Sequence, residues 1–394
     1  MKLKKRVLIV TAKWPYATSS TDGGDSTTKE IIHSLKNEYY LDMLCFRNDI
    51  DEKAEIEGIK NLYFCYDDFA QFKNYQLHSE KKFLIRIAQA KIARREIGKI
   101  DQNYDFIVIQ HVMFILDMAE DKELLNKVVL YPMFTGISYL KSGDKVPEIY
   151  INCEKRVLPL AKMIISPSKV EKHMLVEDYG VDEGKIMVVP RPVDYAFHLR
   201  KITQKKKIKL LYIASIRTQK CHMNAMKLIK TIINKGVDAE LHCVGAVQDN
   251  IIFFECMDYL KKNALTHHVV FHGNKSHDQV ETIMRNCDIN ISTSRWETFG
   301  RGVYEGMVCG LPTVVTNKLE CVTKADNIGI YPCVVNSLDE MVNTIMDLFF
   351  DEKKYKAESE KGKKLSTILS VTKVDELIRE KYKEVFNIWD TIKS

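Results

Sequence analysis

Short apolar runs alternate with longer helical patterns along nearly the whole chain, and this alternation limits the possible folds more than any other feature. Most of the runs are continuously apolar, which is typical of parallel strands buried on both faces. The strand candidates are Val7–Thr11, Leu41–Phe46, Phe106–Gln110, Lys127–Tyr131, Met163–Ser166, Ile186–Val189, Lys209–Ala214, Ala239–Gly245, Val269–Gly273, Ile289–Ser292, Pro312–Thr316 and Gly329–Val335. Helical patterns such as Ser26–Glu38, His222–Lys235 and His277–Asn286 lie between them. The sequence therefore predicts an α/β protein with two Rossmann-like, doubly wound domains.

The boundary between the two domains is visible in the sequence. A chain of 394 residues is long enough for two domains of about 150–200 residues each. The stretch 199–207 is polar and basic, so we interpret it as a solvated linker. We expect a first domain at 1–200, a second at 207–373, and a final helix with its apolar pattern from Val374 to Trp389.

Composition and charge narrow the class of protein. Hydrophobic residues make up 45% and charged residues 28%, which is globular composition. No run of about 20 apolar residues is present, so no transmembrane helix is expected. The ten cysteines lack zinc or C-x-x-C spacing, which favours a reducing, cytoplasmic setting. A net charge of +6 suits anionic small ligands or an anionic membrane surface, and it is too weak to predict nucleic-acid binding.

Ligands of open α/β sheets bind beyond the carboxyl ends of the strands, so the segments that follow the strands are the candidate sites. The first holds Gly23 and Gly24, which let backbone amides approach a ligand, before a helix that Asp25 or Ser26 can cap. The alternative is a plain turn with a good cap. The second, after Lys209–Ala214, delivers cationic side chains suited to a diphosphate, or it is a basic surface loop.

The third segment, after Ile289–Ser292, is the most specific. It places Glu297 in the loop and Glu305 near the start of the next helix, with Gly300 and Gly302 between them. Carboxylates accept hydrogen bonds from sugar hydroxyls, while free amides and a helix N-terminus stabilise phosphate. A pair of glutamates alone is more often a solvated helix face, so the string between them carries the prediction.

The stretch from Glu297 to Pro312 resembles the E-x7-E donor-binding motif of the family 4 retaining glycosyltransferases. These enzymes have the GT-B fold, in which two Rossmann-like domains face each other across a cleft. Residues 154–194 and Val269–Gly273 are also similar to family landmarks. The resemblance implies an acceptor-binding first domain, a nucleotide-sugar-binding second domain, and a last helix, 374–394, that packs back onto the first.

The same resemblance assigns roles to individual residues. Glu297 would contact hydroxyls of the donor sugar, Glu305 the ribose hydroxyls, and Lys220 the diphosphate, so Glu297, Lys220 and Arg217 are the expected catalytic residues. The remaining expected donor-binding residues are Gly23, Gly24, Ser215, Gly245, Gly273, Asn274, Phe299, Gly300, Arg301 and Gly302.

The chain departs from the family pattern at three places. Ala214-Ser215 stands where the family has Gly-Arg, and Arg217, two positions later, is a candidate substitute. Arg191-Pro192 replaces Asn-Gly, and residues 131–134 lack the usual histidine. His111 is a possible replacement for that histidine, but a structural role is favoured.

These features together predict a retaining glycosyltransferase. It would move a hexose or an N-acetylhexosamine from a nucleotide sugar, UDP more than GDP, to a glycan, lipid-linked or small-molecule acceptor. No metal or other cofactor is expected, because cationic side chains are placed to neutralise the diphosphate. Asp49-Ile50-Asp51 is formally a D-x-D metal motif, but we interpret it as a solvated loop.

Other functions remain open at this point. A non-catalytic GT-B sugar-binding protein, a sugar-nucleotide epimerase and a phosphorylase would share the fold. A nicotinamide dehydrogenase is disfavoured, because no G-x-G-x-x-G follows a strand. Residues 81–97 read as a basic amphipathic helix, which predicts either peripheral contact with the inner face of a membrane or an internal helix edged by Lys and Arg stems.

Overall fold

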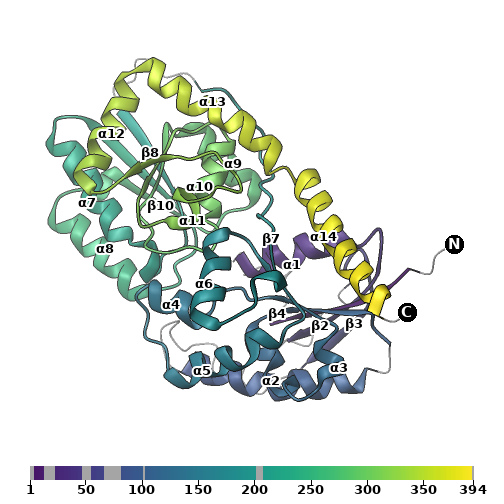
Figure 1. Ribbon diagram of the computed structural model, residues 1–394. Coiled ribbons are helices and arrows are strands. Elements are labelled where there is room, and N and C mark those ends of the chain that lie inside the picture. Colours follow the sequence, from purple (N-terminus) through teal and green to yellow (C-terminus); the bar gives the residue numbers. More distant parts are fainter. Residues whose placement is uncertain are drawn as a thin grey trace.

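The computed structural model describes residues 4–12, 23–46, 55–65, 81–100, 103–200 and 207–392. They form two α/β lobes, each built on one parallel sheet with helices packed against it (Figure 1). Central strands such as Phe106–Gln110 and Val128–Tyr131 are fully buried and rich in Val, Ile and Leu, as the continuous apolar runs predict.

The first lobe has seven described strands in the order β3-β2-β1-β4-β5-β6-β7, and all neighbours pair in parallel. The strands are β1 (Arg6–Thr11), β2 (Tyr40–Phe46), β3 (Ile59–Cys65), β4 (Phe106–Gln110), β5 (Val128–Tyr131), β6 (Met163–Ser166) and β7 (Ile186–Val188). The helices are α1 (Gly23–Leu35), α2 (Lys81–Lys99), α3 (Lys122–Leu125), α4 (Gly136–Lys141), α5 (Glu148–Val157) and α6 (Lys169–Tyr179), with a 3-10 helix, η2, at Val112–Met118.

The second lobe has six described strands in the order β10-β9-β8-β11-β12-β13, again all parallel. They are β8 (Lys207–Ile213), β9 (Asp238–Val244), β10 (Val269–Gly273), β11 (Ile289–Ser292), β12 (Thr313–Thr316) and β13 (Cys333–Val335). Around them lie α7 (His222–Asn234), α8 (Asn250–Lys262), α9 (His277–Asn286), α10 (Arg301–Val308), α11 (Glu320–Thr323), α12 (Leu338–Phe350) and α13 (Glu352–Ile368), with a 3-10 helix, η5, at Thr218–Lys220.

Both strand orders reverse direction inside the sheet, between β1 and β4 in the first lobe and between β8 and β11 in the second. This reversal defines a doubly wound sheet, so the predicted fold class is confirmed. Crevices outside such reversal points are where open α/β sheets bind ligands. The loops after β8 and β11 are therefore the first place to look for chemistry.

Three local predictions were wrong. The edge strand β3 was missed, because Lys60 and Asn61 interrupt its apolar pattern and its residues are only half-buried. The predicted strand 329–335 is shorter in the structure, where β13 spans only Cys333–Val335 and Gly329 has a left-handed φ of +67°. Helix α1 begins at Gly23, ahead of the start at Asp25 or Ser26 that the sequence predicted.

The last helix, α14 (Val371–Ile392), leaves the second lobe and runs along the first, where it lies beside α1 (Figure 1). Asp375 accepts a hydrogen bond from the Ser34 hydroxyl and lies 2.7 Å from Nδ1 of His33. Further along α14, the Tyr382 hydroxyl donates to that of Tyr131 at 3.4 Å. The chain thus crosses between the lobes twice, at residues 190–207 and again at α14.

The first crossing is anchored rather than simply solvated. The Arg200 guanidinium donates hydrogen bonds to the main-chain oxygens of Met284 and Arg285, at 2.7 and 2.6 Å. Residues 201–206 of the predicted linker lie outside the described part of the chain.

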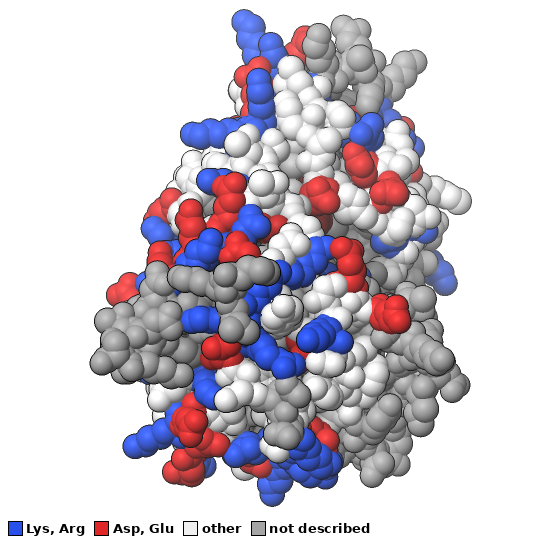
Figure 2. Space-filling view, turned by 90° about the vertical axis from the view of Figure 1, so that its right-hand side faces the viewer, with Lys and Arg blue, Asp and Glu red and all other residues white. Residues whose placement is uncertain are grey.

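Helix α2 buries most of its apolar face against η2, including Phe83, Ala90, Ala93 and Ile97, while Leu84 stays exposed. None of the described helices is long and apolar enough to cross a bilayer. Basic and acidic side chains are interspersed on the face shown in Figure 2. All ten cysteines are free and most are buried, in keeping with a role as small core residues. Asp49 and Asp51 lie outside the described residues.

Two glycines bring α10 unusually close to the second sheet. A Cβ atom added at Gly302 would lie 2.4 Å from the carbonyl oxygen of Ile213, and one at Gly306 would lie 2.3 Å from Nδ2 of Asn290. The Asn290 amide also donates to the carbonyl of Gly302 at 3.1 Å. Helix α10 is therefore fixed against the end of β8 and against β11.

We predict that Gly302→Ala displaces α10 and lowers the midpoint of thermal unfolding. Overpacking against backbone costs about 2 kcal/mol, and for a domain of this size that corresponds to roughly 4–8 °C. Gly98→Ala is the control, since its Cβ would meet only the guanidinium of Arg94, at an ordinary contact distance of 3.4 Å. Alanine is the better helix former, so this control should keep or raise the midpoint. Equal midpoints for Gly302→Ala and the wild type would contradict the packing argument.

Candidate functional site

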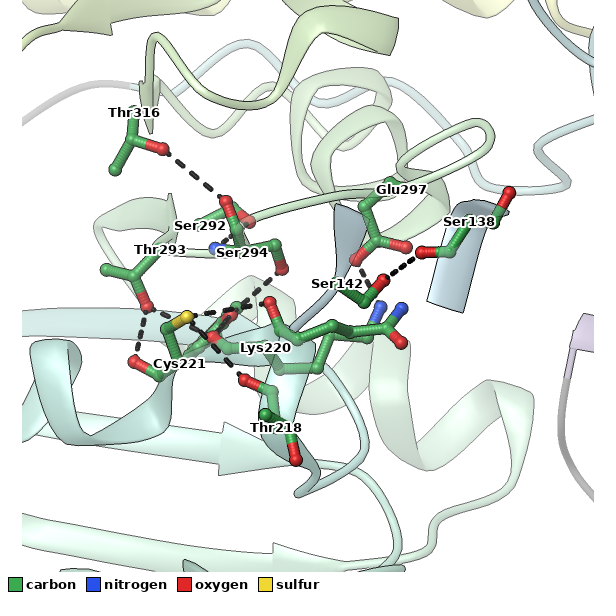
Figure 3. Close-up of polar contacts among 12 residues, drawn as sticks. Ser138, Ser142, Thr218, Lys220, Cys221, Ser292, Thr293, Ser294, Glu297 and Thr316 are labelled. Atoms are coloured by element: carbon green, nitrogen blue, oxygen red, sulfur yellow. Dashed lines mark hydrogen bonds and ion pairs between the residues drawn. The ribbon is translucent and has the colours of Figure 1, made fainter. Parts of the chain in front are cut away.

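An ion pair joins the loops that follow β8 and β11. The Lys220 ammonium donates to a carboxylate oxygen of Glu297 (Figure 3). Both side chains are largely buried, with 13% and 15% of their surfaces exposed. Two of the predicted catalytic residues thus meet at the reversal point of the second sheet.

The main chain of Lys220 is held in place by hydrogen bonds from both flanking strands. Its carbonyl accepts from the Tyr212 hydroxyl on β8. The Thr293 hydroxyl, just after β11, donates to the carbonyls of Lys220 and Cys221 at 3.3 and 3.0 Å (Figure 3). Cys221 takes a left-handed conformation with φ 51°, which turns the chain into α7. The lysine is therefore positioned by the fold before any ligand binds.

Burial lowers the pKa of the Lys220 ammonium, and the neighbouring Arg217 lowers it further, while the Glu297 carboxylate opposes both effects. The site thus holds two cationic side chains, Lys220 and Arg217, close to one carboxylate, Glu297. Such an arrangement favours a ligand that brings additional negative charge.

Arg217 reaches toward the first lobe. Phe134 lies in the loop after β5, and the Arg217 guanidinium lies over its ring, 5.6 Å from the centroid. Its Nε is buried without a hydrogen-bond partner, and no carboxylate pairs with Arg217 among the residues that the structure describes. Arg217 therefore has donors to offer a ligand between the lobes.

Four predicted donor-site residues lie along the carboxyl ends of β8, β9 and β10. Gly245 has a φ of +150°, and a Cβ there would lie 2.7 Å from the main-chain nitrogen of Ser215. The Gly245 amide donates to the carbonyl of Gly273 at 3.0 Å, and Asn274 follows directly. The structure thus brings Ser215, Gly245, Gly273 and Asn274 together at one edge of the sheet.

The segment after Glu297 presents main chain rather than side chains. The Phe299 side chain is buried against Tyr304, with ring centroids 4.8 Å apart. Gly300 precedes α10 with φ 80°, and a Cβ there would lie 2.7 Å from Val322. Only the backbone of these two residues is left for a ligand, at the N-terminus of a helix.

Glu305 lies in the second turn of α10. Burial raises the pKa of its carboxyl, while Arg301 and His277 act in the opposite direction. His277, the first residue of α9, stacks on Tyr195 with ring centroids 4.1 Å apart. This carboxyl therefore sits next to an aromatic pair that the sequence did not suggest.

In the first lobe, Gly23 and Gly24 are the first two residues of α1. His111 follows β4, and its Nδ1 accepts a hydrogen bond from the Met113 amide, so it caps η2. Burial lowers the pKa of His111 well below its usual value, which keeps the ring neutral. This geometry favours the structural role for His111.

Sequence reasoning missed two residues, Trp296 in the loop after β11 and Glu154 in α5. Trp296 packs into the core of the first lobe, and the Lys141 ammonium lies 5.0 Å from its ring centroid. Glu154 is fully buried and accepts hydrogen bonds of 2.7 Å from the Gly136 amide and the Tyr179 hydroxyl, which fixes the start of α4. Only their contacts with distant segments set them apart, so no local pattern marks them.

Two family models match the chain. The model described as glycosyl transferases group 1 matches residues 196–365, and the model described as Glycosyltransferase Family 4 matches residues 21–197. Together they span both lobes and most of the chain.

Curated proteins also match the chain, at low sequence identity. An "uncharacterized 41.2 kDa protein in cps region" of Klebsiella pneumoniae is 24% identical over 287 residues, or 69% of this chain and 75% of that protein. Mannosylfructose-phosphate synthase of Agrobacterium fabrum is 26% identical over 183 residues, which covers 43% of this chain and only 38% of its own length.

Solved structures match over nearly the full length. Sucrose-phosphate synthase from Thermosynechococcus elongatus superposes with a TM-score of 0.78 at 13% identity, covering 98% of this chain and all of that one. The Anabaena protein HepE, in complex with UDP-glucose, gives 0.65 at 14% identity, covering 96% and 99%. These likenesses establish the GT-B arrangement of the two lobes.

The buried carboxyl of Glu154 gives a prediction about pH. Burial raises its pKa to about 8, against the hydrogen bonds from Tyr179 and Gly136, while the unfolded value is near 4.5. The folded chain therefore keeps a proton that the unfolded chain loses, and this contribution to stability disappears as pH rises from about 4.5 to 8. Glu154→Gln has no such proton, so its melting midpoint relative to the wild type should rise by several degrees between about pH 5 and 8.5. A midpoint difference that does not change with pH, measured by differential scanning fluorimetry, would refute the shifted pKa.

Proposed function

Since the chain belongs to the glycosyltransferases that these two family models describe, we propose that it moves a hexose or an N-acetylhexosamine from a nucleotide sugar to an acceptor. The observation that carries this proposal is the Lys220–Glu297 ion pair at the reversal point of the second sheet. The acceptor is a glycan, a lipid-linked sugar or a small molecule.

The cations of the site suit a departing nucleoside diphosphate. Breaking the bond between the anomeric carbon and the diphosphate oxygen leaves negative charge on the diphosphate. Lys220, Arg217 and the amides at the start of α10 stabilise that charge, and they do so most in the transition state. With these groups in place, the proposed reaction needs no metal ion.

The carboxylates suit the sugar and ribose hydroxyls. Glu297 accepts hydrogen bonds from donor-sugar hydroxyls and holds Lys220 in position, while Glu305 accepts from the ribose hydroxyls. Transfer proceeds with retention, the acceptor attacking on the face that the diphosphate leaves. No side chain acts as a covalent nucleophile in this scheme.

UDP is the proposed nucleotide, ahead of GDP. The support is the likeness to HepE, whose structure contains UDP-glucose, over 96% of this chain. The alternative is a sugar-binding GT-B protein without activity, or an epimerase that needs no acceptor. Release of free nucleotide only when acceptor is added would separate transfer from both.

A cytoplasmic location, with or without peripheral membrane contact through 81–97, remains a proposal. Phe83, Ala90, Ala93 and Ile97 are buried. Their burial supports the alternative in which this is an internal helix that packs on the protein core. Failure to co-sediment with anionic liposomes at low salt would exclude the lipid reading.

We predict that Lys220→Ala and Glu297→Ala each lower kcat by at least about 100-fold, because each removes a group that stabilises developing charge or its partner. Initial rates of nucleotide release with donor and acceptor provide the measurement. Lys262→Ala, which removes an exposed lysine on α8, is the control and should turn over like the wild type. Wild-type turnover in either Lys220→Ala or Glu297→Ala would refute the proposed catalytic roles.

Nucleotide specificity can be tested before the acceptor is known. A ligand at 100 times its Kd stabilises the folded state by about 2.7 kcal/mol. UDP should raise the melting midpoint at lower concentration than GDP, and Lys220→Ala should weaken the UDP response. A stronger response to GDP would overturn the choice of base.

A further inference from the structure

An ion pair between the lobes joins the proposed donor site to α1. Arg301 is the first residue of α10 in the second lobe, and its guanidinium donates to a carboxylate oxygen of Glu30 in the middle of α1. Glu30 is 13% exposed and Arg301 30% exposed. A second guanidinium, that of Arg191, lies 3.9 Å from the other oxygen of Glu30. The carboxylate is therefore held between two arginines.

Helix α1 is fixed at several points along its length. The Thr28 hydroxyl donates to Oε1 of Gln110 at the end of β4, at 2.6 Å. Farther on, His33 and Ser34 contact Asp375 of α14. Its first residues are Gly23 and Gly24, which are proposed to contact the donor. Glu30 thus connects α10, through Arg301, to a helix that is itself well anchored.

The side chain and the main chain of Arg301 serve different purposes. Its main chain lies in the first turn of α10, which we propose to face the diphosphate, whereas its side chain is engaged by the other lobe. Loss of Arg301 should be costly, because the largely buried Glu30 carboxylate would lose its hydrogen-bonded partner and stay desolvated. The placement of this turn therefore depends on the approach of α1.

We propose that Glu30 is a positioning residue for the donor: through Arg301 it holds the first turn of α10, and with it Glu305, in the geometry that binds the nucleotide. This inference rests on the proposed function and deepens it. Glu30 itself need not touch the reacting atoms, so its loss should act on donor binding rather than on the chemical step.

The test is a double-mutant cycle on the full chain with Glu30→Gln, Arg301→Gln and the double variant, read by the Kd for UDP from calorimetry. Each single variant should raise the Kd by about 5- to 50-fold, and the double variant should be no weaker than the worse single one. In the transferase assay the donor KM should rise by a similar factor while kcat stays within about twofold. Glu30→Asp, which keeps the charge on a shorter stem, should fall between wild type and Glu30→Gln.

Arg94→Gln is the matched control, since it removes a half-exposed arginine whose partner, Asp121, lies 2.8 Å away within the first lobe. It should leave the Kd for UDP unchanged. Unchanged Kd values in the Glu30 and Arg301 variants, or single effects that simply add, would overturn the positioning role. If the wild type bound neither UDP nor GDP, the proposed function would fall and the inference with it, which separates the two failures.

Discussion

The reversal of strand order in the second sheet is the constraint on which the candidate site depends. Strands β8 and β11 are neighbours in the sheet, and their connections leave in opposite directions. The loops that follow these two strands therefore lie next to each other. Lys220 follows one strand and Glu297 the other, so the topology itself brings them into contact. Tyr212 and Thr293 then hold the lysine's main chain, which leaves its ammonium to the carboxylate or to an incoming anion.

Close backbone packing extends this constraint to the next helix. Without side chains at Gly302 and Gly306, α10 rests directly on Ile213 at the end of β8 and on Asn290 within β11. Helix α10 begins at Arg301, shortly after Glu297 in the chain, and carries Glu305 one turn further along. Arg301 then connects this helix to α1 of the other lobe. Helix α10 is thus packed closely on its own sheet and is also tied to the other lobe by an ion pair.

Patterns that are local in the sequence predicted most of the fold, and long-range contacts account for most of what was missed. Continuous apolar runs identify buried parallel strands, so the central strands were found while the half-buried edge strand β3 was not. The order of segments after the strands pointed to Lys220 and Glu297. Nothing local marks Glu30, which acquires its role only when α1 meets a helix 271 residues away along the chain. Trp296, a second-lobe residue in the first lobe's core, is hidden for the same reason.

The three departures from the family pattern bear on whether activity is retained, because the structure places them in contact with other parts of the site. Arg217, which follows the altered Ala214-Ser215, lies over Phe134 in the loop that lacks the usual histidine. Arg191, in place of Asn-Gly, lies 5.6 Å from the ring centroid of Tyr131 and beside Glu30. A decayed site would be expected to lose charges independently. Here the altered segments keep their cations, since Arg217 packs on Phe134 and Arg191 on Tyr131, both within the altered stretch 131–134, which favours rearranged contacts within a working site over the non-catalytic alternative.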